Sequence, residues 1–75
     1  MRAGELLRLL RRLAIRHGWS YDWRPDLGKG SHGRVTINGR RTVVPYLKAE
    51  LKTGTLRAIL KGLEIAAEDL SGDKE

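Results

Sequence analysis

The hydrophobic positions near the start of the chain repeat with the period of an α-helix. Between residues 5 and 17 one apolar stripe is formed by Leu6, Leu7, Leu9, Leu10, Leu13 and Ala14. Gly18 follows, where helices commonly end in a left-handed residue. The pattern predicts an amphipathic helix. Its polar side carries four like charges, typical of an anion-binding face or of a plainly solvated one: Arg8, Arg11, Arg12 and Arg16.

The next segment alternates with the period of a β-strand. Trp19, Tyr21 and Trp23 alternate with polar residues up to Pro25, and together they indicate a first strand over residues 19–24. Aromatic side chains between basic residues can stack on nucleic-acid bases. In a protein without Phe, three aromatic side chains on one strand face favour a place in the core instead.

A β-hairpin is the clearest local signal in the chain. Residues 31–37 and 41–44 flank Asn38-Gly39, a pair that suits a two-residue turn because both of its central residues need a positive φ. This turn pairs Ile37 with Arg40 and fixes which residues share a face. One face then holds Val35, Ile37 and Val44, and the other holds His32, Arg34, Thr36 and Arg41.

After Pro45 the pattern predicts a connector over residues 46–52 and a second helix. Thr53 or Thr55 is expected to cap that helix, and Gly62 to weaken or end it. Its apolar stripe consists of Leu56, Ile59, Leu60 and Leu63.

Residues 65–70 suit one more helical turn, and residues 71–75 are expected to form a frayed acidic tail. The order of helix, three strands and helix predicts an α+β fold in which both helices cover one face of an antiparallel three-stranded sheet. The other face is left open. This α-β-β-β-α arrangement is that of the double-stranded-RNA-binding domain.

Length and charge narrow the class of protein. A chain of 75 residues has room for one domain, with a core expected over residues 5–70. Residues 1–62 hold 14 Lys and Arg against four acidic residues, a balance of +10, whereas residues 63–75 carry one Lys against five acids, a balance of −4. A basic body attracts polyanions, of which nucleic acid is the commonest.

The cellular location is also constrained by composition. The chain has no Cys, so it forms no disulfide framework. It also has no apolar stretch long enough to span a membrane. Its arginine-studded start does not resemble a signal peptide. These features predict a cytoplasmic protein.

Two histidines are the only side chains that titrate near neutral pH. His17 ends the first predicted helix, where the helix dipole favours a structural role. His32 follows Lys29-Gly30-Ser31 and shares the polar strand face with Arg34, so it is the better candidate for contact with a phosphodiester. The four acidic residues of the basic body show no paired spacing, so neither a two-carboxylate hydrolase nor a metal site is supported, and no cofactor is expected.

RNA is the easier phosphodiester to cleave, because its 2′-hydroxyl can attack the adjacent phosphorus. A protein then needs to supply only proton transfer and charge stabilisation. His32 can serve as general base or general acid but not as both at once. Lys29, Arg34 and Tyr46 are candidates for charge stabilisation or for the second proton transfer.

Two motifs at this separation closely resemble the HicA family. The first is Lys-Gly-Ser-His-Gly over residues 29–33, followed by the hairpin and Val-Val-Pro over residues 43–45. The second is Leu-Lys-Thr-Gly-Thr-Leu-Arg-Ala-Ile-Leu over residues 51–60. The likeness covers about residues 5–70, which is nearly the whole chain.

The resemblance implies a toxin of a toxin–antitoxin system: a metal-independent endoribonuclease that cleaves mRNA, arrests translation and is neutralised by a HicB antitoxin. It places the catalytic histidine at His32. RNA contacts are expected from Lys29, Gly30, Ser31, Arg34 and Arg41 near the phosphate, and from Lys48, Lys52 and Arg57 farther out.

The chain departs from the family pattern at two positions. Many members have a second histidine where this chain has Gly33, and another shortly after the Val-Pro, where it has Tyr46-Leu47. A paired-histidine mechanism therefore does not carry over.

Three other functions compete with the ribonuclease. The main rival is a non-catalytic RNA-binding module of the same fold, which would depend on Lys and Arg but not on His32. A protein-binding adaptor would show no salt-dependent affinity for RNA. A DNA-binding helix-turn-helix is the least favoured, because strands separate the two helices.

Overall fold

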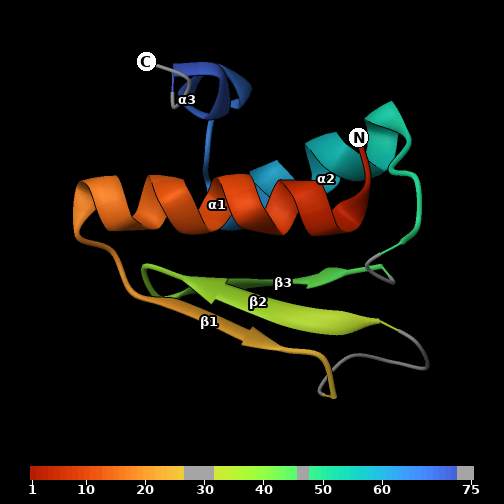
Figure 1. Ribbon diagram of the computed structural model, residues 1–75, viewed down its shortest axis with the longest axis horizontal. Coiled ribbons are helices and arrows are strands. Elements are labelled where there is room, and N and C mark those ends of the chain that lie inside the picture. Colours follow the sequence, from red (N-terminus) through yellow and green to blue (C-terminus); the bar gives the residue numbers. More distant parts are fainter. Residues whose placement is uncertain (27–31, 46–47, 73–75) are drawn as a thin grey trace.

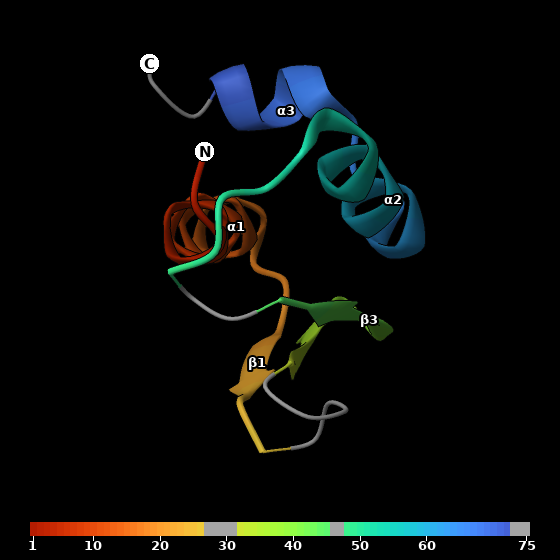
Figure 2. The ribbon, with the colours of Figure 1, turned by 90° about the vertical axis from the view of Figure 1, so that its right-hand side faces the viewer.

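The protein is a two-layer α+β structure in which helices cover one face of a three-stranded sheet. The computed structural model describes residues 1–26, 32–45 and 48–72. Seen from the side, α1 lies over β1 and α2 lies over β3, with α3 above both helices (Figure 2). The opposite face of the sheet carries no helix, as the sequence predicts (Figure 1).

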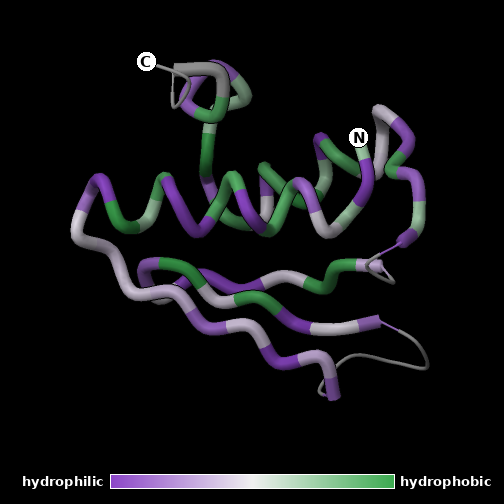
Figure 3. The backbone as a smooth tube through the Cα atoms, viewed as in Figure 1, coloured by the Kyte–Doolittle hydropathy of each residue, from purple (hydrophilic) through white to green (hydrophobic). Residues whose placement is uncertain are grey.

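Helix α1 (Ala3–His17) is the amphipathic helix expected from the leucine stripe. It begins two residues earlier than the stripe indicates and ends at Gly18, whose φ of 70° is left-handed. The backbone N–H of Trp19 then donates to the carbonyl of Ala14 at 2.8 Å, which closes the helix end. Apolar and polar residues alternate along the helix in Figure 3, and Leu6, Leu7, Leu10 and Leu13 are buried in the core.

The sheet is an antiparallel meander of β1 (Tyr21–Arg24), β2 (Gly33–Ile37) and β3 (Arg40–Val44) in the order β1-β2-β3. The predicted register is confirmed, because Ile37 pairs with Arg40 and Val35 with Thr42. Asn38 and Gly39 have the positive φ values, 52° and 82°, that the two-residue turn requires.

Helix α2 (Thr53–Leu63) corrects two predictions about its ends. Lys52 occupies the N-cap position without a side-chain hydrogen bond, so neither Thr53 nor Thr55 caps the helix. Gly62 lies inside the helix. A Cβ there would meet Thr42 at 3.1 Å, so the glycine allows α2 to approach β3 closely.

The expected extra helical turn is α3 (Ala67–Gly72), which extends two residues into the segment predicted to be frayed. Glu64 has a left-handed φ of 57° and ends α2, and Ile65 then enters the core. Leu70 is buried as well and joins α3 to the same cluster.

The start of the chain ties the two helical segments together. The N–H of Ala3 donates to the carbonyl of Ala49 at 3.0 Å, and the N–H of Leu51 donates to the carbonyl of Met1 at 2.9 Å. These bonds hold the segment before α2 against the start of α1. The start of α2 is thereby placed at the end of the molecule where β2 begins and β3 ends (Figure 1).

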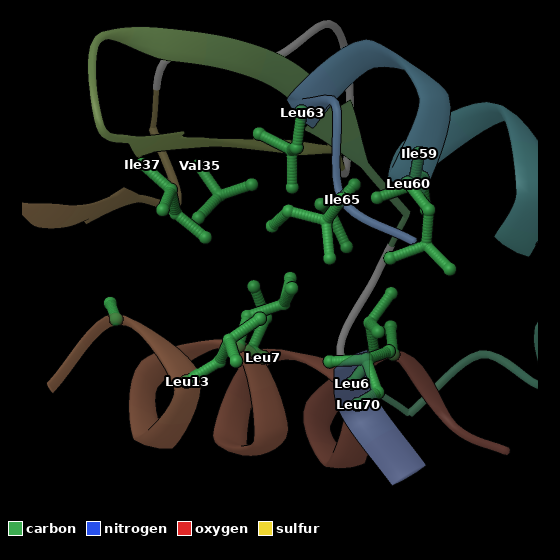
Figure 4. Packing of buried hydrophobic residues seen from close by; sticks show 14 of the residues in the cluster. Leu6, Leu7, Leu13, Val35, Ile37, Ile59, Leu60, Leu63, Ile65 and Leu70 are labelled. Atoms are coloured by element: carbon green, nitrogen blue, oxygen red, sulfur yellow. The ribbon is translucent and has the colours of Figure 1, made fainter. Parts of the chain in front are cut away.

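The core fills the space between the helices and the covered face of the sheet, as Figure 4 shows. It is aliphatic, and it draws on α1, α2, α3 and strands β2 and β3. Its largest fully buried side chains are Leu6, Leu10, Leu13, Val35, Ile37 and Val44. Trp19, Tyr21 and Trp23 pack against it while remaining half-buried, which agrees with the core position favoured for them. The architecture is that of the double-stranded-RNA-binding domain, with α3 added.

Candidate active site and nucleic-acid interface

His32 lies at the start of β2 and is exposed to solvent. It directly precedes Gly33, the first residue of the strand, so its backbone is held by the sheet on one side. Other predicted site residues, Lys29, Gly30, Ser31 and Tyr46, lie outside the described residues. The described surroundings of His32 are therefore β2 and the two strands that pair with it, β1 and β3.

The ring of Trp23 packs against the backbone at Gly33, the residue after His32. A Cβ built on Gly33 would lie 2.2, 2.7 and 2.9 Å from three ring carbons of Trp23, far inside van der Waals contact. The indole therefore fills the space that any other side chain at position 33 would need. This packing explains why a second histidine cannot stand directly after His32 while Trp23 keeps its place.

The open face of the sheet is defined by the residues that alternate away from the helices: Asp22, Arg24, Arg34, Thr36, Arg41 and Val43. Arg34 lies two positions from His32 and opposite Arg24 on β1. Among the described residues, no hydrogen-bond partner meets the buried Nε of Arg34. Two arginine side chains opposite each other repel. An anion bound between Arg24 and Arg34 would relieve this repulsion, so the pair is suited to an anion.

The structure adds Arg24 to the site and separates Arg41 from it. Arg24 is half-exposed, and its contact with a described acidic residue is long, 3.9 Å from its Nε to Oδ1 of Asp26. The alternation in the sequence places Arg24 among the polar residues of the first strand. Its position opposite Arg34 follows only from the register between β1 and β2. Arg41 pairs with Thr36, four positions along β2 from His32, or about 13 Å at the usual strand rise.

The remaining predicted RNA contacts are Lys48, Lys52 and Arg57, all of them exposed. Lys52 stands at the start of α2, in the helical layer, and Arg57 lies farther along the same helix. The fold brings the start of α2 to the same end of the molecule as the start of β2 (Figure 1). It does not bring these three residues onto the open face.

The described side chains offer no grouping typical of a metal centre. Within residues 1–26, 32–45 and 48–70, no cluster of three or more His, Cys, Asp or Glu could hold an ion. His17 stacks on Trp19 with ring centroids 4.4 Å apart at the end of α1, which matches its predicted structural role. Among the described residues, the chemistry available at the site is one exposed imidazole at the start of a strand that also carries a guanidinium group.

Comparison with protein families gives a match to the model described as HicA toxin of bacterial toxin–antitoxin, over residues 5–65. The chain belongs to the HicA toxin family. No match was found among curated proteins or among solved structures. As a HicA family protein it is a toxin of a toxin–antitoxin system, and an antitoxin is its expected counterpart. No helix among the residues that the structure describes is long and apolar enough to cross a membrane.

Proposed function

We propose that this HicA family toxin is an endoribonuclease that cleaves mRNA, with His32 as its acid–base residue. The observation that carries the proposal is the place of His32: an exposed imidazole at the start of β2, two positions from the arginine pair of the open face. A phosphodiester beside this histidine would find a proton-transfer group and two guanidinium groups together.

The reaction needs only groups that the chain and the RNA supply. The 2′-oxygen of the RNA forms a bond to phosphorus while the bond from phosphorus to the 5′-oxygen breaks, which leaves a 2′,3′-cyclic phosphate and a 5′-hydroxyl. Neutral His32 takes the proton from the 2′-hydroxyl, or its protonated form gives one to the leaving oxygen. Because the nucleophile belongs to the substrate, no metal-activated water is required.

The charges of the sheet support the same assignment. Arg34 and Arg24 lie opposite each other on neighbouring strands, and in this proposal they stabilise the negative charge that builds up on the phosphorane, because a preorganised cation lowers the barrier. Lys29, Arg34 and Tyr46 are candidates for the second proton-transfer or charge-stabilising group. We assign Arg41, Lys48, Lys52 and Arg57 to RNA phosphates farther from the cleaved bond, and also assign RNA contacts to Gly30 and Ser31, the two residues that precede His32 in the sequence.

An antitoxin of the HicB type is the proposed partner, and cytoplasmic mRNA the proposed target. A partner that covers the start of β2 would block His32. Acidic groups on that partner would be attracted by the same cations that attract RNA.

The test compares the two histidines of the chain in a bacterial host, with growth and mRNA integrity as readouts. His32→Ala is expected to lose cleavage by about a hundredfold or more and to relieve growth arrest. His17→Ala is the matched control, since it removes the other imidazole from an exposed helix end, and it should behave as wild type. Full cleavage by His32→Ala would contradict the proposal.

A non-catalytic RNA-binding module is the second candidate. The paired arginines of the open face favour it, because they would hold a phosphate without any proton transfer. In that case both His32→Ala and wild type would arrest growth with mRNA intact, and substitutions of Arg24 or Arg34 would relieve the arrest.

A further inference from the structure

A groove between α1 and β1 lies outside the site described above. It has a volume of about 260 Å³ and is lined by Gly4, Leu7, Arg8, Arg11, Tyr21 and Trp23. Figure 2 shows α1 directly over β1 on this side of the molecule, with α2 and β3 on the other. The groove therefore opens along the outer edge of the sheet.

The floor of the groove is formed by two aromatic rings held in place. Tyr21 and Trp23 alternate along β1, pack against the core and remain partly exposed. The hydroxyl of Tyr21 lies 3.5 Å from the carbonyl of Leu7 on α1, to which it donates. Burial raises the pKa of Tyr21 above its ordinary value of 10.0. Fixed, partly exposed rings of this kind are stacking platforms for bases.

The rim of the groove is cationic. Arg8 and Arg11 are exposed and lie three residues apart on α1, so they project on the same side of the helix. Arg11 lines the groove together with Tyr21, and its positive charge opposes the rise that burial causes in the pKa of Tyr21. No acidic side chain is among the groove's described lining residues.

Trp23 links the groove to the strand segment that carries His32. The same Trp23 that forms part of its floor has its ring against Gly33, the residue after His32. His32 and Gly33 alternate to opposite faces of β2, so a single-stranded RNA that contacts both His32 and the groove has to pass around the edge of the sheet at β1.

We propose that the groove between α1 and β1 binds one nucleotide of a single-stranded RNA, next to the nucleotide at His32. Its base stacks on Trp23 and Tyr21, and its phosphate pairs with Arg8 and Arg11. The adjacency to a cleaved bond rests on the proposed function, whereas the binding of RNA in the groove does not. The aromatic floor and paired cations suit a nucleotide better than an acidic peptide, because every nucleotide combines a flat base with a phosphate, whereas carboxylate side chains offer no ring to stack on Trp23.

The test measures binding of a short single-stranded RNA to the full chain carrying His32→Ala and Trp19→Phe. The first change prevents cleavage and the second leaves Trp23 as the only tryptophan. Fluorescence of Trp23 then reports stacking, and anisotropy of labelled RNA reports affinity. The groove variant adds Arg8→Gln and Arg11→Gln. The matched control adds Arg12→Gln and Lys61→Gln, which remove the same charge from exposed positions that do not line the groove.

RNA is expected to quench Trp23, and the groove variant to bind about tenfold or more weakly with the quenching lost. The matched control should lose about threefold or less, because it removes only diffuse charge. Inorganic polyphosphate should bind without quenching.

Equal losses in the two double variants, or equal quenching by polyphosphate, would overturn the groove as a nucleotide site. RNA binding unaffected by the groove variant, together with weakened binding of an antitoxin, would assign the groove to the protein partner and also overturn the proposal. Cleavage by the chain with its native His32 is measured separately. A chain that binds RNA in the groove without cutting it would overturn only the proposed function.

Discussion

The two faces of the sheet are built from neighbouring residues of the same strands, yet one packs in the core and the other presents charged side chains to solvent. The covered face holds Val35, Ile37 and Val44, which are almost fully buried under the helices. The open face holds Arg24, Arg34 and Arg41, with Val43 half-exposed among them. Because strand side chains alternate, each strand can anchor the core with one residue and present a charge with the next. Stability and binding are thus separable by position.

The largest expected effect is on the covered face. Ile37→Ala removes a side chain that is 1% exposed and should lower the free energy of unfolding by about 2–5 kcal/mol. Arg41→Gln, on the open face of the neighbouring strand, should change it by about 0.5 kcal/mol or less. Urea unfolding of both variants checks the pair. Similar losses would show that the two faces are not separable.

A smaller effect on the free energy of unfolding is expected at Gly33, which lies on the covered face and follows His32. Gly33→Ala places a methyl group against the ring of Trp23 and should cost about 1–3 kcal/mol. In a Trp23→Leu background the same change should cost much less, because the obstructing ring is gone. A double-mutant cycle of unfolding free energies measures this coupling. The same cost in both backgrounds would contradict the close packing as its cause.

The open face is expected to trade stability for binding. Arg24→Gln removes the repulsion with Arg34 across the two strands and should raise the free energy of unfolding by about 0.2–1 kcal/mol. Added salt should reduce this gain in stability, because it screens the repulsion. The substitution should also lower the affinity for RNA, because it removes a cation. Arg24→Lys keeps the charge and serves as the control without a gain. A loss of stability in Arg24→Gln would mean that the arginine is held by favourable contacts instead.

The smallest effect concerns Tyr21 and appears only at high pH. Burial raises the pKa of Tyr21 above its ordinary value of 10.0, so its contribution to stability is complete below that value. The contribution is lost as the pH rises through the higher folded value, because the unfolded chain releases the proton more readily. Tyr21→Phe should therefore match wild type near pH 7 to within about 1 kcal/mol and lose less stability in alkali. Parallel alkaline slopes for the two proteins would contradict this.

Local patterns were sufficient for most of the fold. The leucine stripe and Gly18 specified α1, and Asn38-Gly39 specified the hairpin with its register, because a two-residue turn leaves one pairing that keeps Val35 and Ile37 on the same face. Helix ends were less predictable. Lys52 took the N-cap in place of a threonine, since the chain is already held there by the bonds of Leu51 to Met1.

For the candidate site, the sequence by itself determined the residue types: one histidine before a strand, arginines on its polar face, and membership of the HicA family over most of the chain. Only the tertiary structure decided which of these residues meet. Pairing of β1 with β2 set Arg24 opposite Arg34 and pressed Trp23 against Gly33, and the strand rise carried Arg41 away from His32. The packing of α1 over β1 made a groove from two segments whose lining residues are ten or more positions apart in the sequence. Alternation within a segment is a local property of the backbone, whereas contacts between segments depend on register and packing across the whole core.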